Sequence, residues 1–150
     1  MRIRLDLRSP VLRNSELFAR AARDAIEATI RVNLEHMREL GAPSLYSSGV
    51  RYRLEPPGVE DFTDLQTLLE RGWGDCSQLA AWRVAELRHR GESGAGIRLT
   101  WRRNRLTGQR MFHVLVRRAD GRIEDPSVRL GMHSGEAVTI DKRPVIGWTR

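Results

Sequence analysis

The sequence predicts an α+β domain in which helices, one of them carrying the only cysteine, pack on an antiparallel sheet. Apolar residues recur at steps of three and four over residues 14–40 and again after Cys76, a spacing typical of helices with a buried face. Apolar and polar residues alternate over residues 97–101 and 109–118, which indicates two strands. The Asp120-Gly121 dipeptide that follows predicts a hairpin turn.

The N-terminal part, residues 1–43, is predicted to form a strand followed by a long helix. Apolar and polar residues alternate over residues 1–7, as expected for a strand with one buried face. Asn14 or Ser15 can cap the helix, because such side chains accept hydrogen bonds from N–H groups of the first turn. Gly41 is expected to end the helix.

Two short elements are predicted between the long helix and the cysteine. Residues 50–54 alternate in polarity like a short strand, which the Pro-rich turn after it must end. Asp61 is expected to cap a short helix that begins with Phe62 and carries three leucines. This helix would deliver the chain to the cysteine and pack on the same sheet as the helix that follows.

Cys76 lies at the start of a predicted helix that Gly91 ends. Gly72 and Gly74 allow the chain to turn sharply into this helix. The N–H groups of a first helical turn and the helix dipole stabilise a sulfur anion there, so we predict a thiol pKa below its ordinary value. The adjacent Asp75 disfavours the anion unless its carboxylate is engaged in a cap or by an arginine.

The length of the loop after residues 109–118 decides whether His113 and Asp125 can meet. A two-residue loop, 120–121, would place Asp125 on the sheet face opposite to His113. A three-residue loop, 119–121, places both on one face as diagonal neighbours, about 7–8 Å apart at the backbone. We predict the three-residue loop, with its last residue, a glycine, in the left-handed conformation. The Asp-Pro pair then ends the strand.

The composition bounds the class of protein. The chain of 150 residues is 40% hydrophobic and 30% charged, and we predict one domain, 1–150. No apolar run is as long as a membrane span, and one cysteine permits no internal disulfide, so we expect a cytoplasmic protein. The net charge of +7, with Arg102–Arg105 as the densest basic run, raises nucleic acid as a partner. Because Lys142 is the only lysine among 26 basic residues, the excess charge reflects general arginine usage, and we do not expect nucleic acid as the partner.

Three motifs in this order resemble one known family. GWGDC, FHVLV and EDPS are similar to motifs of the transglutaminase-like branch of the papain-like cysteine enzymes, in its compact bacterial and phage-encoded form. The resemblance covers about residues 50–132 and leaves 133–150 as a C-terminal edge segment. It implies a papain-like core with a catalytic triad of Cys76, His113 and Asp125.

The resemblance also implies a reaction, on a protein or peptide substrate. Cys76 would attack an amide carbonyl to form a thioester, and water or an amine would resolve it, giving a peptidase, an amidase or a transglutaminase. No cofactor and no metal are expected, and a calcium requirement is not carried over. The second donor to the oxyanion, beside the Cys76 N–H, stays open. The candidates are Tyr52, Gln66 and Trp73.

Other interpretations of the same residues stay open. His133 is a rival for the base, whereas His36 and His89 are expected to be structural or surface residues. The chain could be an inactive module of this fold, such as an assembly factor of a phage particle and then part of the virion. It could also bind nucleic acid through its arginines. The oligomeric state is not predicted.

Overall fold

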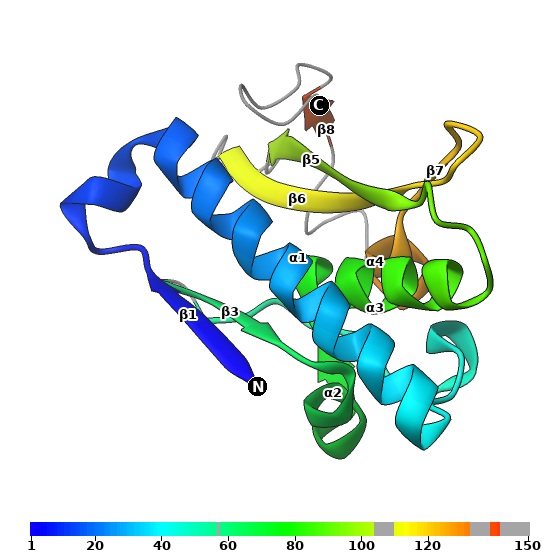
Figure 1. Cartoon of the computed structure of the whole chain (residues 1–150). Helices are drawn as coiled ribbons and strands as arrows, with labels where there is room; N and C mark the ends of the chain where they lie inside the picture. The colour runs from blue at the N-terminus through cyan, green and yellow to red at the C-terminus, as the bar shows by residue number, and fades with distance from the viewer. Residues whose placement is uncertain (57, 104–109, 133–138, 142–150) are drawn as a thin grey trace.

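The computed structural model describes residues 1–56, 58–103, 110–132 and 139–141, and it has the predicted α+β class (Figure 1). In chain order its elements are β1 Arg2–Asp6, η1 Pro10–Arg13, α1 Ser15–Leu40, η2 Leu45–Ser47, β2 Arg51–Tyr52, β3 Val59–Thr63, α2 Leu65–Arg71, β4 Trp73–Gly74, α3 Cys76–His89, β5 Gly96–Arg103, β6 Arg110–Arg117, β7 Ile123–Glu124, α4 Pro126–Arg129 and β8 Thr139–Asp141.

Within the described residues the strands form three small sheets. The largest is antiparallel, in the order β7-β6-β5-β8, and the other two are an antiparallel β1–β3 pair and a parallel β2–β4 pair. The predicted edge strand near the C-terminus is present as β8, at residues 139–141. The rest of the 133–150 segment lies outside the described residues.

The long helix α1 begins and ends where the sequence predicts. The Asn14 side chain accepts hydrogen bonds from the N–H groups of Glu16 and Leu17, and Gly41 takes the left-handed conformation, with φ of 65°, at the other end. A stripe of apolar side chains on α1, including Ile26 and Ile30, is buried. Figure 1 shows α1 running across the molecule in front of α3, against which it packs.

The predicted start of the short helix, with Asp61 as its cap, is wrong. Residues 59–63 form β3, and the helix α2 begins only at Leu65 with Asp64 as its cap. Residue 61 is in a strand because β3 pairs with β1 at the N-terminus. Arg4 donates two hydrogen bonds to the Asp61 carboxylate, with N···O distances of 2.7 and 2.9 Å, so Asp61 joins two strands instead of capping a helix.

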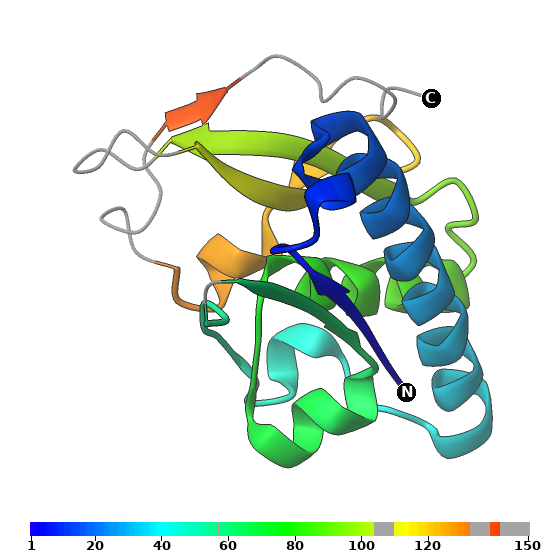
Figure 2. The same ribbon diagram turned by 90° about the vertical axis from the view of Figure 1, so that its left-hand side faces the viewer.

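The cysteine-bearing helix α3 forms the centre of the fold. It packs against α1 on one side and against β6 and α4 on others, and Figure 2 shows it below the four-stranded sheet. All its residues from Ser77 to Leu87 are buried, Trp82 completely. The sequence predicts a single apolar stripe here, but the small side chains of Ala80, Ala81 and Ala85 let neighbouring elements approach from several directions.

The hairpin between β6 and β7 has the predicted register. Val116 pairs with Glu124 and Arg117 with Ile123, which leaves residues 119–121 as a three-residue loop beyond the Arg118–Arg122 hydrogen bond of 2.8 Å. Gly121 has a φ of 89°, the left-handed conformation that this loop requires. His113 and Asp125 are therefore on the same face of the sheet.

Candidate active site

Cys76 is the first residue of α3, and the residues that cap the helix, Asp75 and Gln78, lie before and after it in the chain. The Asp75 side chain accepts hydrogen bonds from the N–H groups of Ser77 and Gln78, at 3.1 and 3.2 Å. The Gln78 side chain in turn accepts from the Asp75 N–H, at 3.1 Å, which completes a capping box. The cap uses the N–H groups of the two residues after Cys76. The Cys76 N–H belongs to the same first turn, whose N–H groups have no acceptor within the helix.

The thiol of Cys76 meets the open edge of β6. The Arg118 N–H bonds to Arg122 across the hairpin, and the N–H of every second residue of a strand faces the same neighbour, so the Val114 N–H faces the β7 side as well. β7 ends at Glu124, before it would reach this position. The Val114 N–H instead donates a hydrogen bond to the Cys76 sulfur.

His113 and Asp125 form the contact that the sequence predicts. His113 Nε2 lies 2.9 Å from Asp125 Oδ2. The imidazole is buried, with 2% of its side chain exposed, whereas the carboxylate is 17% exposed. Asp125 Oδ1 accepts from the Val128 N–H at 3.3 Å, so the first turn of α4 fixes the carboxylate. An ionised carboxylate only accepts hydrogen bonds, which assigns the proton to Nε2 and the lone pair to Nδ1.

The prediction of a lowered thiol pKa is wrong. Burial raises the pKa of Cys76 well above its ordinary value, and the charges of Asp75, Glu60 and Asp125 raise it further, while the Val114 N–H opposes them. The effect of the helix start on the thiol is thus outweighed by burial and by the charges of the three carboxylates. Cys76 as a whole residue is nevertheless only partly buried.

A cluster of acidic residues that the sequence does not predict lies beside the cysteine. Glu55, Asp75 and Asp61 are buried, and burial together with the charges of Asp75 and Glu55 raises the pKa of Glu60 well above its ordinary value. Glu60 is hydrogen-bonded to Asp75, an arrangement that needs a proton between the two carboxylates. Burial first, and then the charge of Glu55, raises the pKa of Asp75 to about 7. The position of Glu60 could not be predicted from nearby residues, because it depends on the pairing of β3 with β1.

The Gln78 side chain connects this cluster to its surroundings. Its amide donates to Glu55 Oε1 at 2.9 Å and to the Asp61 carbonyl at 2.7 Å, and its oxygen accepts from the Arg71 guanidinium. Arg71 also lies 3.8 Å from Glu55. The Arg71 guanidinium partly offsets the negative charge next to the capping box.

The other predicted site residues are distributed as follows. Tyr52 pairs with Gly74, two residues before Cys76, whereas Gln66 is exposed on α2 and the Trp73 ring packs against the guanidinium of Arg71 at 3.7 Å. The role of oxyanion donor stays a prediction for these residues. His89 is exposed at the end of α3, as expected.

His133, the rival base, lies outside the described residues, as do the side chains of Arg102–Arg105. Among the residues that the structure describes, no group of three or more His, Cys, Asp or Glu side chains could hold a metal ion. In the same residues, no helix is long and apolar enough to cross a membrane.

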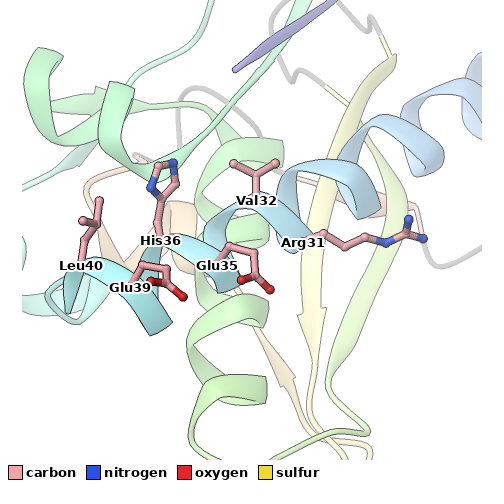
Figure 3. Close-up of a pocket in the computed structure, with 6 residues that line it drawn as sticks. All are labelled: Arg31, Val32, Glu35, His36, Glu39 and Leu40. Atoms are coloured by element: carbon pink, nitrogen blue, oxygen red, sulfur yellow. The ribbon is translucent and has the colours of Figure 1, made fainter.

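A shallow hollow on α1 is separate from the cysteine site (Figure 3). The residues that line it all belong to this helix: Arg31, Val32, Glu35, His36, Glu39 and Leu40. His36, predicted to be a structural histidine, is half-buried with Nε2 3.6 Å from Asp64 Oδ2. In Figure 3 the six labelled side chains all project from α1. Among the described residues, no other element contributes to the lining of this hollow.

Comparison of the chain with protein-family models, with curated proteins and with solved structures found no match. The local geometry around Cys76 is therefore the basis for a functional assignment.

Proposed function

We propose that this protein is a cysteine-dependent acyl-transfer enzyme that acts on amide bonds, with a papain-like core of the transglutaminase-like type. Cys76 is the nucleophile, His113 the general base and acid, and Asp125 the carboxylate that orients His113. One observation supports this assignment above all. The imidazole that lies 2.9 Å from Asp125 belongs to the strand residue next to Val114, whose N–H bonds the Cys76 sulfur.

The reaction follows from these positions. As the sulfur attacks the carbonyl carbon, His113 Nδ1 accepts the thiol proton and the carbonyl electron pair moves to oxygen, beside the Cys76 N–H. The imidazolium then gives its proton to the leaving nitrogen as the C–N bond breaks, which leaves a thioester. Water resolves the thioester to a carboxylic acid, or an amine resolves it to a new amide, and either step restores the thiol.

The surroundings of the thiol determine its resting state. Because burial and the carboxylate of Asp75 raise the pKa of Cys76, the thiol is protonated at neutral pH. Proton transfer to His113 then accompanies the attack on substrate instead of preceding it. This differs from a resting thiolate–imidazolium pair, and it makes the free enzyme a slow target for alkylating agents near pH 7.

A chromogenic ester tests the proposal without knowledge of the natural substrate. With p-nitrophenyl acetate we expect release of p-nitrophenol and an acetyl group on Cys76, measured by absorbance and by intact-protein mass. His113→Ala should slow acetylation by roughly 100-fold or more, whereas His89→Ala, which changes an exposed histidine at the other end of α3, should leave it unchanged. Addition of a primary amine then separates transfer from hydrolysis. Acetylation that is equally fast in His113→Ala and in the wild type would contradict the proposal.

A second function is favoured by one observation. The carboxylates near Cys76 raise the pKa of its thiol, and a thiol that is not activated at rest is what a non-catalytic module of this fold would have. Such a module could serve as a binding or assembly platform, for example in a phage particle. In that case Cys76 reacts as an ordinary buried thiol, and neither His113 nor Asp125 changes its rate. The ester experiment decides between the two functions.

A further inference from the structure

We propose that Glu124 is a positioning residue of this site, which holds Asp125 at the correct distance from the helix that carries Cys76. The inference rests on the proposed function, because it assigns Glu124 a role through the His113–Asp125 contact. Glu124 is the residue immediately before Asp125 and the last residue of β7.

Both carboxylate oxygens of Glu124 are fully engaged. Oε2 accepts from Arg83 Nε at 2.8 Å and from the Tyr46 hydroxyl at 3.0 Å. Oε1 accepts from the same Arg83 guanidinium at 3.1 Å and from Arg118 at 2.6 Å. The Glu124 side chain is 15% exposed and that of Arg83 is 8% exposed, so the bidentate ion pair is shielded from water.

The partners of Glu124 connect it to the cysteine helix. Arg83 belongs to α3, seven residues after Cys76, which is about two turns or roughly 10 Å along the helix. Tyr46 packs between two guanidinium groups, those of Arg83 at 4.8 Å and of Arg129 on α4 at 3.7 Å. Burial, followed by the charge of Glu124, raises the pKa of Tyr46 to about 12, so the phenol remains a donor. The cluster therefore joins α3, α4 and β7.

The connection to α3 helps to fix Asp125 because β7 is only two residues long. Only Ile123 and Glu124 pair with β6, and a two-residue edge strand does little by itself to fix the residue that follows it. Asp125 follows directly, and its carboxylate must meet His113 while the cysteine approaches the same strand from α3. The Glu124–Arg83 ion pair connects the residue before Asp125 to the helix that carries Cys76.

The matched variants are Glu124→Gln and Glu92→Gln. Glu92 also binds Arg118, with two N···O distances of 2.8 Å, but it lies in the loop after α3. Its other hydrogen bond comes from the Ala119 N–H and not from Arg83 or Tyr46, so its loss removes an ion pair of the same cluster without releasing β7 from the helix. Tyr46→Phe removes one of the donors to Glu124 and serves as a milder variant should Glu124→Gln fail to fold.

The first measurement is the NMR signal of the His113 Nε2 proton, which is shielded from exchange while it is bonded to Asp125. We expect the signal in the wild type and in Glu92→Gln, and its loss in Glu124→Gln with the amide spectrum otherwise retained. For Tyr46→Phe we expect faster exchange with water. A signal that persists unchanged in Glu124→Gln, or in Tyr46→Phe if the former does not fold, overturns the inference. This readout needs no catalysis, so it judges Glu124 even if the proposed function fails.

The second measurement separates positioning from general stabilisation. We expect Glu124→Gln to slow the acetylation of Cys76 by roughly tenfold in the wild-type background and to have no effect in the Asp125→Ala background. A loss of the same size in both backgrounds would indicate a purely structural role and would overturn the inference.

Discussion

The Glu60–Asp75 carboxyl pair predicts an unusual dependence of stability on pH. Asp75 is buried and Glu60 is half-buried, and the pKa of Asp75 is raised from 3.8 to about 7. The folded protein therefore retains a proton that the unfolded chain releases above about pH 4. Since stability falls with rising pH wherever the folded state binds more protons, this pair lowers the free energy of unfolding between about pH 4 and 7.

The magnitude follows from the pKa of Asp75. A rise from 3.8 to about 7 is about three units, and each unit corresponds to about 1.4 kcal/mol. The pair therefore costs up to about 4 kcal/mol above pH 7. In Glu60→Gln the amide donates to Asp75 without needing a shared proton, but burial and the charge of Glu55 still disfavour the Asp75 anion. We expect this variant to gain about 1–3 kcal/mol over the wild type at pH 8 and almost nothing at pH 4.

Urea unfolding at pH 4, 6 and 8 measures this difference. Glu92→Gln is the matched control, because hydrogen bonds from Arg118 lower the pKa of Glu92, and its loss should destabilise the protein at pH 8 instead. If Glu60→Gln were no more stable than the wild type at pH 8, or gained equally at pH 4, the two carboxylates would not share a proton and the prediction would be wrong.

Two further predictions concern the start of α3. Asp75→Asn keeps a capping side chain and removes the carboxylate next to the sulfur, so the pKa of Cys76 should fall and the pH profile of iodoacetamide alkylation should move to lower pH; an unmoved profile would contradict the electrostatic account. Gly74→Ala places a Cβ 3.1 Å from a Leu79 methyl and 3.2 Å from a Leu68 methyl, so urea unfolding should show a loss of about 1–3 kcal/mol. The matched change Gly96→Ala, whose Cβ meets Arg117 at 3.5 Å, should be nearly neutral.

The parts of the fold that were predictable from the sequence are set by neighbouring residues. The cap at Asn14 and the left-handed Gly41 define α1, and the loop ending at Gly121 defines the register that joins His113 to Asp125. In each case a side chain acts on backbone groups a few residues away, so a short pattern contains the information.

The unpredicted parts depend on contacts between distant segments. Asp61 lies in a strand because β3 pairs with β1, near the N-terminus of the chain. Arg2 and Arg4 of β1 bind the Asp61 carboxylate across this pairing. The same pairing places Glu60 beside Asp75. The charge of Glu60 then adds to burial and to the charge of Asp75, which raise the pKa of the Cys76 thiol. The sequence around Cys76 specifies the helix start that favours an anion and the adjacent Asp75 that disfavours it, but not the burial of the thiol or the carboxylate of Glu60.

The three-residue loop at 119–121 also bears on how such a site is gained or lost in evolution. Its residues are exposed, and substitutions at the two positions before Gly121 should be tolerated. A deletion of one codon, however, would turn Asp125 to the other face of the sheet. Cys76, His113 and Asp125 would still align perfectly with their counterparts in such a gene, although the site would no longer exist. For chains of this kind the spacing between aligned residues is as informative as their identity.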